Sequence, residues 1–465
     1  MNRIVWVAAW VSLCLFGSAW GAEEAASSRP NVIVLFADDQ RADTIGALGN
    51  SHIKTPHLDR LARRGMAFDR AYMQGGLQGA TCVPSRAMLL TGRSLFRVDE
   101  TLKRDETWPA AFGRSGYSTF VTGKWHNHPD AIAQSFTSAH SIFAGGMTNP
   151  LEAKLSQVVN GKLTKPVLVP KHACEVFADV AIAFIKAQKE GPFLAYVAFD
   201  APHDPHIVPE DFAVKYEASD VPLPGNFLPQ HRWDNGEMTV RDEQLLSWPR
   251  KPEDVQQMNA EYYRYISYLD EQVGRILDAL EASPHAKNTI VVYAADSGVA
   301  RGSHGLIGKQ NVYEHSMRVP LLISGPGIAG GKRTNAMCYL LDLFPTLGAM
   351  CQVKGPGTSE GLSFQKVLID PSQPGRDHIL LAYRDVQRAV RDDRYKLIRY
   401  PKIDRTQLFD LQSDPEEIHD LSDKQELGEK KTRLLASLKE LQAEFGDKAP
   451  LVVANPTPAE WSPPK

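Results

Sequence analysis

The chain has 465 residues, 43% of them hydrophobic and 23% charged, which is the composition of a globular protein. A formal net charge of −3 excludes a nucleic-acid partner held by a broad basic surface. This net charge is compatible with an anionic substrate bound in a small basic pocket. The length favours one large domain and a smaller one.

The first 21 residues have the pattern of a secretory signal peptide. One early positive residue, Arg3, precedes a short apolar stretch over residues 4–16, and Ala19 and Gly21 occupy the two positions that a signal peptidase reads. The apolar stretch is too short for a membrane span. We therefore expect a periplasmic or secreted protein without stable membrane insertion.

Cleavage after residue 21 removes Cys14 and leaves four cysteines, at positions 82, 174, 338 and 351. An exported protein can pair its cysteines, and four of them allow three pairings between which the sequence does not choose. If Cys82 has a chemical role, at most one disulfide forms among Cys174, Cys338 and Cys351.

Apolar strands and amphipathic helices alternate along most of the chain. Continuous apolar runs favour strands buried on both faces, and the alternation predicts an α/β fold with a mainly parallel sheet flanked by helices. The expected strands are 31–37, a strand ending at 124, 192–200, 288–298 and 318–327; the expected helices are 57–64, 84–91, 176–188, 259–283 and 340–350.

Two segments depart from that alternation. Residues 201–250 have no clear helix or strand pattern, and long segments of this kind are usually functional or disordered. From about residue 375, short strands with turn residues between them and a closing helix over 430–445 predict a small α+β subdomain with a short antiparallel sheet. We divide the mature chain into 22–374 and 375–465.

Acidic residues follow two of the predicted strands. Asp38 and Asp39 come directly after the first strand, and Asp296 ends the 288–298 strand. Because ligands of open α/β sheets bind beyond the carboxyl ends of the strands, we expect these side chains to converge. Carboxylate oxygens without thiolates favour Ca²⁺ or Mg²⁺ over zinc. The alternative is that one aspartate caps a helix and the others are solvated.

Cys82 lies in TCVPSRAMLLTGR (81–93), where Pro84 suits the first turn of a helix and Arg86 lies one turn further along. A thiol at a helix N-terminus has a lowered pKa, so a thiolate nucleophile is one hypothesis. A buried structural cysteine is another. An exposed thiolate is vulnerable in an oxidising compartment, which weighs against the first.

The ordered motifs of the chain resemble those of type I sulfatases in the alkaline phosphatase superfamily. CVPSR matches the C-x-P-S-R signature, and NVIVLFADDQR, TGKWH, APHDPH, AADSG and GSHGLIGKQNVYEHSMRVPLLISGPG accompany it between about residues 30 and 350. LFDLQSDPEEIHDL resembles the C-terminal part of the family. The resemblance implies a sulfuric ester hydrolase with an alkaline phosphatase-like fold and a catalytic domain over 22–374.

The resemblance implies that Cys82 is oxidised to Cα-formylglycine by a maturation enzyme, and that the hydrated aldehyde is the nucleophile. It assigns Ca²⁺ to Asp38, Asp39, Asp296 and the modified Cys82. The residue after the third aspartate is usually Asn or His in the family, but here it is Ser297, so a hydroxyl or a water would have to fill the fourth position.

The same resemblance assigns roles to cationic residues. Arg86 would hold the hydrated aldehyde, while Lys124, His203 and Lys309 would contact sulfate, with His203 or Lys309 protonating the leaving alcohol. His126 would help to expel sulfate from a covalent sulfo-enzyme. Metal and cationic clamps neutralise the charge that makes a sulfate ester a poor leaving group.

The substrate is less constrained by the sequence. We expect an exo-acting enzyme on a sulfated carbohydrate, with choline sulfate, aryl sulfates and phosphate or phosphonate esters as alternatives, and a non-catalytic binding protein as a third hypothesis. Trp233 would stack on a sugar or lie in the core. The candidate substrate-binding residues are His206, Asn235, Arg301 and His304.

Overall fold

The central sheet of the computed structural model, which describes residues 29–463, has eight strands in the order β15-β2-β14-β12-β1-β11-β5-β6. The predicted signal peptide lies outside the described residues. The strands are β1 (Asn31–Ala37), β2 (Met66–Phe68), β5 (Ser118–Lys124), β6 (Ser138–Phe143), β11 (Phe193–Ala198), β12 (Thr289–Ala295), β14 (Leu321–Ser324) and β15 (Lys332–Thr334).

The sheet is mixed, with a parallel centre. Each neighbouring pair in the series β12-β1-β11-β5-β6 is parallel, as the sequence predicts. The strand expected over 318–327 forms as β14, but it runs antiparallel to both β12 and β2. The chain reaches it through a loop and the four-residue helix α7 (Glu314–Met317), without the crossover helix that parallel neighbours need.

Strand β1 separates two hydrophobic cores. Its alternate residues Val32, Val34 and Phe36 pack in one core, and Ile33, Leu35 and Ala37 pack in the other. This alternation follows from the two-residue period of a strand. It explains the unbroken apolar run in the sequence, because both faces of the strand are covered.

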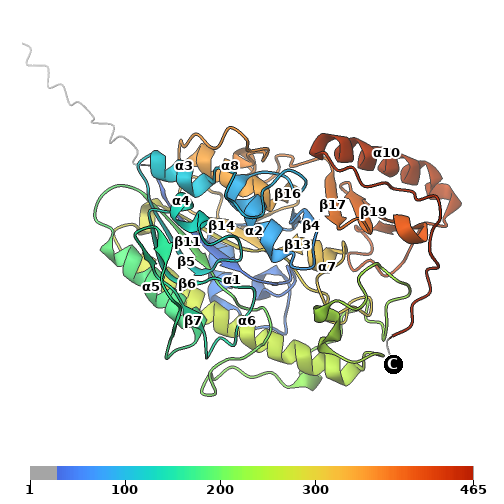
Figure 1. Cartoon of the computed structure of the whole chain (residues 1–465), viewed down its shortest axis with the longest axis horizontal. Helices are drawn as coiled ribbons and strands as arrows, with labels where there is room; N and C mark the ends of the chain where they lie inside the picture. Colours follow the sequence, from blue (N-terminus) through green and yellow to red (C-terminus); the bar gives the residue numbers. More distant parts are fainter. Residues whose placement is uncertain (1–28, 464–465) are drawn as a thin grey trace, which may run out of the picture.

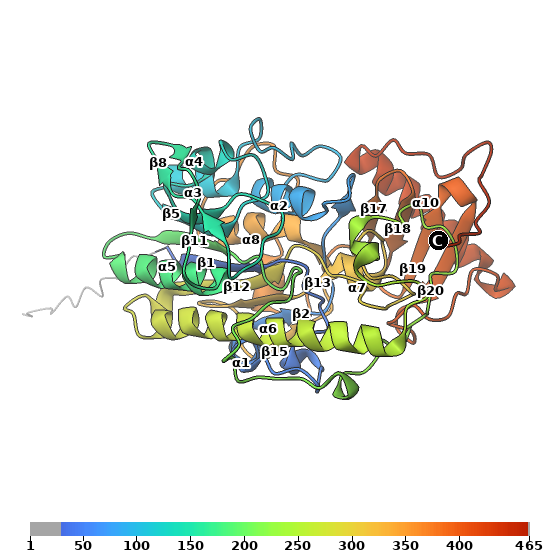
Figure 2. The same cartoon turned by 60° about the horizontal axis from the view of Figure 1, so that its bottom comes forward.

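Helices cover both faces of the sheet (Figures 1 and 2). The core that contains Ile33 includes side chains from α1 (Pro56–Arg64), α5 (Ala173–Ala187) and α6 (Pro252–Glu281). The opposite core includes side chains from α2 (Cys82–Thr91), α3 (Trp108–Arg114) and α8 (Leu343–Met350). The expected α/β architecture with flanking helices is therefore confirmed. The remaining α-helices are α4 (Ala131–Ser135), α9 (Gln365–Ile369) and α10 (Gly428–Phe445).

The C-terminal region forms a second, five-stranded sheet beside α10, as the orange and red segments of Figure 1 show. Strands β17 to β20 pair antiparallel, as expected. The sheet also takes β4 (Gly75–Gly76), a segment from far upstream, which pairs parallel with β17. A Cβ on Gly75 would lie 1.8 Å from the Ala382 carbonyl oxygen, so this pairing needs glycine. The strands are β17 (Ile379–Tyr383), β18 (Gln387–Arg391), β19 (Tyr395–Tyr400) and β20 (Arg405–Asp410).

Several very short strands escape prediction, because two residues carry no detectable period. They are β3 (Ala71–Tyr72), β7 (Lys154–Leu155), β8 (Val158–Val159), β9 (Lys162–Leu163), β10 (Val167–Leu168) and β16 (Cys338–Tyr339), whereas β13 (Arg318–Val319) lies within the strand predicted over 318–327. The segment over 201–250 contains only two 3₁₀ turns, η2 (Ala218–Asp220) and η3 (Arg241–Leu245), in agreement with its featureless sequence.

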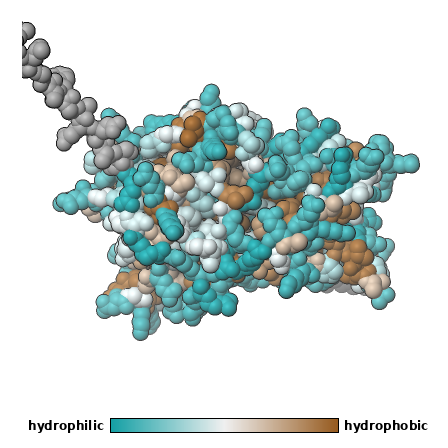
Figure 3. All heavy atoms as spheres, turned by 90° about the horizontal axis from the view of Figure 1, so that it is seen from above, coloured by the Kyte–Doolittle hydropathy of each residue, from teal (hydrophilic) through white to brown (hydrophobic). Residues whose placement is uncertain are grey.

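The face shown in Figure 3 is mostly hydrophilic, with small separate hydrophobic patches. Among residues 29–463, no helix combines the length and apolar character that a membrane crossing requires. Cys82, Cys174, Cys338 and Cys351 are all buried and unpaired.

Candidate active site

The three predicted acidic ligands meet at the carboxyl edge of the central sheet. Strands β1 and β12 are parallel neighbours with Ala37 opposite Ala295, so Asp38 and Asp296 leave the sheet at the same level. The backbone N–H of Asp39 donates to Asp296 Oδ1 at 3.1 Å. Asp38 and Asp296 are fully buried, which makes the convergence of their charges costly unless cations compensate it.

The sulfur of Cys82 completes this group. Helix α2 begins at Cys82, and its Sγ lies 3.5 Å from Asp38 Oδ1 and 3.9 Å from Asp39 Oδ1. The Ser85 hydroxyl donates to the Asp296 carbonyl oxygen at 2.6 Å and ties α2 to the end of β12. One ligand atom from each of Asp38, Asp39, Cys82 and Asp296 lies within 4.8 Å of the others.

Two buried cations lie against the carboxylates on one side. Arg86 donates to Asp38 Oδ2 at 2.6 Å and to Asp296 Oδ2 at 3.0 Å. Lys124, the last residue of β5, has its Nζ 2.6 Å from Asp38 Oδ2. Burial alone would raise the pKa of Asp38, but Lys124 and Arg86 hold it well below its usual range. The carboxylate of Asp38 is therefore ionised.

A third cation bridges the second aspartate and the cysteine. Lys309 Nζ lies 2.7 Å from both carboxylate oxygens of Asp39 and 3.0 Å from Cys82 Sγ. Ser297 also reaches Asp39, because its hydroxyl donates to Asp39 Oδ1 at 2.8 Å. The residue that departs from the family pattern thus lies within the acidic group.

The thiolate hypothesis for Cys82 does not agree with this environment. Burial and the Asp38 carboxylate raise the pKa of the thiol well above its usual range, although Lys309 opposes them. The helix N-terminus and Arg86 favoured the opposite shift, but a cluster of carboxylates in a fully buried site outweighs them. An unmodified Cys82 is therefore a neutral thiol at neutral pH.

His203 adds a titratable group to the rim of the cluster. Its Nε2 lies 3.5 Å from Asp39 Oδ2, and its Nδ1 lies 2.8 Å from the Asp204 carbonyl oxygen and 3.3 Å from the Asp204 carboxylate. Arg241 in turn donates to the Asp204 carboxylate at 2.8 Å. The carbonyl accepts a hydrogen bond, so Nδ1 carries the hydrogen and Nε2 faces the acidic group.

Comparisons with known proteins agree with this arrangement. The sulfatase family model matches residues 30–353, and a model described as N-sulphoglucosamine sulphohydrolase, C-terminal, matches residues 302–444. The chain belongs to the sulfatase family. It is a sulfuric ester hydrolase, and the resemblance inferred from its motifs is confirmed.

Relatives of this sulfatase align along nearly its whole length. An N-acetylglucosamine-6-O-sulfatase of Bacteroides thetaiotaomicron is 27% identical and covers 91% of this chain and 88% of its own. A solved structure in complex with its substrate D-glucosamine-2-N,6-O-disulfate superposes with a TM-score of 0.72, at 24% identity over 91% of this chain and 99% of its own. A phosphonate monoester hydrolase of Agrobacterium radiobacter superposes with a TM-score of 0.71, at 21% identity over 90% and 96%. The two superpositions establish the shared fold.

His126 of the sulfatase lies just beyond Lys124. Burial and the Lys124 charge lower the pKa of His126 to about 3, so its ring is neutral at ordinary pH. Its Nδ1 is buried without a hydrogen-bond partner among the described residues. A Cβ on Gly146 would lie 2.8 Å from its Nε2, so the ring packs directly against that segment. A neutral imidazole with a free nitrogen can accept a proton.

The four candidate substrate-binding residues make three separate sets of contacts. Arg301 Nη1 lies 3.3 Å from His206 Nε2, and the Arg301 guanidinium stacks on the ring of Tyr262. His304 instead stacks on Tyr313, with ring centroids 4.0 Å apart. The side-chain oxygen of Asn235 accepts a hydrogen bond from the Glu237 backbone N–H, and the backbone carbonyl oxygen of Asn235 accepts one from the Gln387 side chain. Among residues 29–463, no hydrogen bond or ion pair joins any of the four to Cys82 or the three aspartates.

Trp233 lies in the core, which is the structural alternative to stacking on a sugar. It is only 5% exposed, lies in the hydrophobic core and packs against Tyr400. Its ring therefore cannot stack on a sugar in this arrangement.

Sequence reasoning missed two residues next to His203. Asp204 stands between the two histidines of APHDPH, so its position in the motif was a usable signal. Arg241 lies in the featureless segment 201–250, and nothing in the local sequence marks it as the partner of Asp204. Asp200, which also follows a strand, accepts a hydrogen bond from Cys174 and is not part of the acidic group.

Proposed function

We propose that this sulfatase is an exported, exo-acting enzyme that removes sulfate from a sulfated carbohydrate, with a hydrated formylglycine formed from Cys82 as its nucleophile. The observation that carries the proposal is the position of Cys82, whose sulfur lies among three aspartates and beside Lys309. A buried neutral thiol has little nucleophilic character, so this position suits a modified side chain better than a native cysteine.

The residues present fit a hard divalent cation. Their donors are carboxylate oxygens with one further oxygen from Ser297, which is the chemistry that Ca²⁺ prefers. Burial and the nearby Asp38 carboxylate raise the pKa of Asp296 to about 7, as expected of a carboxyl group that lacks sufficient positive charge. We propose that Asp38, Asp39, Asp296, Ser297 and the modified residue 82 hold Ca²⁺. When bound, the ion would polarise the sulfate oxygens and favour the attacking oxygen.

The charge balance of the site suits an anionic ester. Three buried carboxylates face three buried cations, Arg86, Lys124 and Lys309, and the side chains of all three cations are at most 3% exposed. With a divalent cation added, the site would have an excess of positive charge. In a site of low dielectric, such an excess stabilises the negative charge that develops on a sulfate leaving its alcohol.

Two histidines supply the proton transfers. We propose that His203, protonated on both ring nitrogens, donates its Nε2 proton to the leaving alcohol, while its Nδ1–H is held by the Asp204 carbonyl oxygen. Arg241 fixes the Asp204 carboxylate, so Asp204 is a positioning residue for His203. We propose that His126 accepts the proton that must leave when sulfate is expelled and the aldehyde is restored, because its buried Nδ1 has no hydrogen-bond partner among the described residues.

Mass spectrometry of the peptide that contains Cys82 tests the nucleophile. The active protein should carry an aldehyde in place of the thiol, a change that the peptides of Cys174 and Cys351 should not show. An unmodified thiol at position 82 in fully active protein would overturn the proposal. Formation of the aldehyde requires a formylglycine-generating enzyme as a transient partner.

A panel of sulfated substrates tests the reaction and the substrate class. We expect sulfate release from a sulfated monosaccharide or from the end of a sulfated oligosaccharide, with lower activity on choline sulfate. Matched aryl sulfate and aryl phosphate esters separate a sulfatase from a phosphate or phosphonate ester hydrolase. Faster turnover of the phosphate ester than of the sulfate ester would contradict the proposal. An absence of sulfate release from every sulfated sugar would also contradict it.

Export can be tested on the full chain. Expression in a bacterium followed by fractionation should place the protein in the periplasm or medium, and its N-terminus should lie after residue 21. Replacing Ala19 with a large charged residue should leave the precursor uncleaved. A full-length chain in the cytoplasm in both cases would contradict the prediction.

A further inference from the structure

Lys309 lies in a buried loop between β12 and α7, which has neither helix nor regular strand around the lysine. The loop folds back on itself, because the backbone N–H of Ala300 donates to the Gly308 carbonyl oxygen at 2.9 Å. The other backbone groups of a buried loop need partners from elsewhere in the fold. The position of the Lys309 ammonium beside Asp39 and Cys82 therefore depends on what holds the two limbs of this loop.

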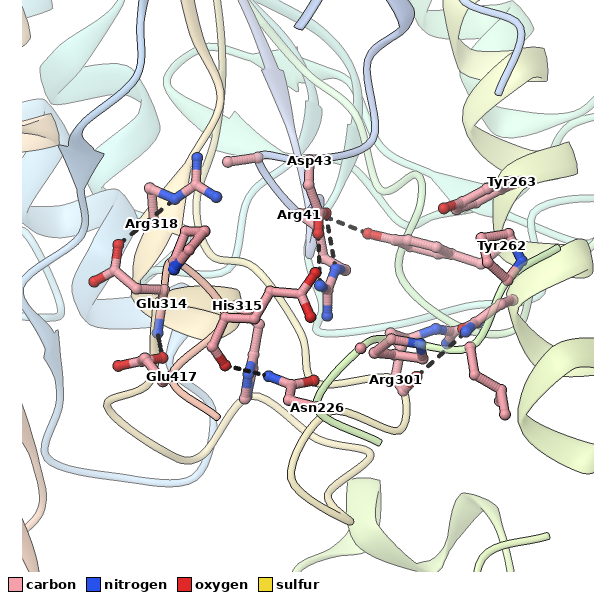
Figure 4. A pocket seen from close by; sticks show the side chains of 18 residues that line it. Arg41, Asp43, Asn226, Tyr262, Tyr263, Arg301, Glu314, His315, Arg318 and Glu417 are labelled. Carbon is pink, nitrogen blue, oxygen red and sulfur yellow. Dashed lines mark hydrogen bonds and ion pairs between the residues drawn. The ribbon is translucent and has the colours of Figure 1, made fainter. Parts of the chain in front are cut away.

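The limb nearer to β12 is held by Arg41. Its Nη1 donates to the carbonyl oxygens of Val299 and Ala300 at 3.1 and 2.8 Å. Arg41 lies in the wall of a cavity of about 180 Å³, where Figure 4 shows it linked to Asp43 and Tyr262. This limb is therefore tied to the segment that follows β1 and to helix α6.

The limb that leads into Lys309 is held by Glu243, a residue of the 3₁₀ turn η3. The Glu243 carboxylate accepts from the Ile307 N–H at 3.1 and 3.0 Å, and from the Gly308 N–H at 2.8 Å. Successive backbone N–H groups of a turn form a concavity that binds anions. Here the anion is a side chain from another segment of the chain, so Glu243 fixes the backbone directly before the lysine.

The Glu243 side chain is itself fixed by Arg250. Arg250 Nη2 donates to Glu243 Oε2 and to the Glu243 carbonyl oxygen, both at 2.8 Å, and the guanidinium stacks on the ring of Trp248. The two charged side chains are 0% and 4% exposed. A buried carboxylate is stable only when cations and N–H donors satisfy it, so its contacts with Arg250 and with the loop hold it in one place.

The residues before Glu243 in η3 also reach the active site. Asp242 accepts from Gln310 Nε2 at 2.7 Å, and Gln310 Oε1 accepts from the Lys309 N–H at 2.9 Å. Arg241, the first residue of the turn, supports His203 indirectly through the neighbouring aspartate. Three consecutive residues of one short turn thus contact the supports of both the lysine and the histidine.

We propose that Glu243 is a positioning residue for Lys309, and that through it η3 sets the place of this ammonium against the acidic group. The inference rests on the proposed function, in which Lys309 contacts the sulfate. An ammonium that has moved by about 1 Å would neutralise the developing charge less well, and a displacement of this size can cost about 10²-fold in rate.

The kinetics of Glu243→Gln in the matured enzyme test the proposal. The amide keeps the shape of the side chain, but its NH₂ group cannot accept from a backbone N–H, so the limb before Lys309 loses support. We expect kcat/KM for an aryl sulfate to fall about 10- to 100-fold. Glu243→Asp keeps the charge and should recover part of this loss. The matched control is Glu253→Gln, at an exposed position of α6, which should leave kcat/KM unchanged.

The same substitution in a Lys309→Ala protein separates positioning from a general structural role. If Glu243 acts through the lysine, Glu243→Gln should lower kcat/KM by less than about 2-fold once that side chain is absent. An aryl sulfate with a good leaving group keeps the slow Lys309→Ala protein measurable. Thermal unfolding shows whether each variant is folded, and Glu243→Asp takes the place of Glu243→Gln in both backgrounds if the amide variant is not.

Two results would overturn the positioning role: equal fold-losses in the two backgrounds, or a folded Glu243→Gln protein with the kcat/KM of the parent. The Lys309→Ala protein alone tests the proposed function, which predicts a loss of at least about 10²-fold. Full activity of Lys309→Ala would contradict the role of the lysine at the sulfate, and the inference would fall with it. A large loss in Lys309→Ala beside an unchanged Glu243→Gln would contradict the inference alone.

Discussion

Two clusters of buried charge among the described residues are organised differently. In the active site, three carboxylates converge on one another and on Cys82 within 4.8 Å. At the junction with the C-terminal sheet, Glu314 and Glu417 both face Lys396, at 3.0 and 2.9 Å. Glu314 also accepts from Arg391 at 3.0 Å and from Tyr72 at 2.8 Å.

The difference separates a chemical role from a structural one. At the junction, carboxylates and cations alternate, so their attraction offsets the cost of burial and joins α7 to the C-terminal sheet. In the active site, Arg86, Lys124 and Lys309 also pair with the carboxylates, but the carboxylates converge on one place beside Cys82. A divalent cation bound at that place, or an anionic substrate bound to it, would gain electrostatic free energy there. Five measurements test this difference between the two clusters.

Removal of the nucleophile should have the largest effect. Cys82→Ala should lower the rate of sulfate release by at least about 10³-fold, because the attacking group is lost while the fold is kept. The measurement is sulfate release by ion chromatography. Cys351→Ala, which also removes a buried unpaired thiol, is the matched control and should keep its activity. Equal losses in both variants would contradict the assignment of Cys82.

Breaking the junction cluster should destabilise the fold. Lys396→Met leaves two buried carboxylates without their shared cation, and we expect the free energy of unfolding to fall by about 3–5 kcal/mol. Urea denaturation measures the change. The control is Lys402→Met, whose ion pair with Asp385 lies at the surface, and it should have little effect. A fully stable Lys396 variant would show that the junction does not depend on this pairing.

Calcium should stabilise the active-site cluster and not the junction. At a concentration of about 100 times its dissociation constant, the ion should raise the free energy of unfolding by about 2.7 kcal/mol and restore activity lost on chelation. Asp38→Asn should abolish the gain, whereas Lys396→Met should keep it. An equal gain in Asp38→Asn would place the ion elsewhere.

The contact between Asp204 and His203 should affect turnover moderately. Asp204→Asn weakens the ion pair with Arg241, and we expect kcat to fall about 10-fold with little change in KM, since a positioning residue acts on the proton transfer. Asp211→Asn, an exposed aspartate in the same segment, is the control. A change in KM alone would indicate a substrate-binding role instead.

The smallest effect concerns acid stability beside the junction. Burial lowers the pKa of His304 to about 3, below its unfolded value of about 6.5. The unfolded state therefore binds more protons between these values, and stability is lost as the pH falls from 6.5 towards 3. His304→Phe should reduce that loss by about 1 kcal/mol between pH 6.5 and 5.5, measured by urea denaturation. An unchanged slope would contradict the lowered pKa of His304.

Local patterns were sufficient for the positions of the acids, the signature cysteine and the main elements. Asp38 and Asp296 follow unbroken apolar runs, and neighbouring parallel strands necessarily end at one edge of their sheet. Pro84 and the helical residues after it placed Cys82 at a helix N-terminus, where the structure has it. These features depend on residues a few positions apart.

Only the tertiary structure decided the electrostatic state of the site and its boundaries. The pKa of Cys82 is raised by carboxylates that lie about forty residues away or more in the chain, and local sequence favoured the opposite direction. Contacts between residues far apart in the sequence also pair Asp204 with Arg241 and His206 with Arg301, and they place β4 in the C-terminal sheet. Burial and pairing are properties of the assembled fold, because they depend on which distant segments exclude water from each other.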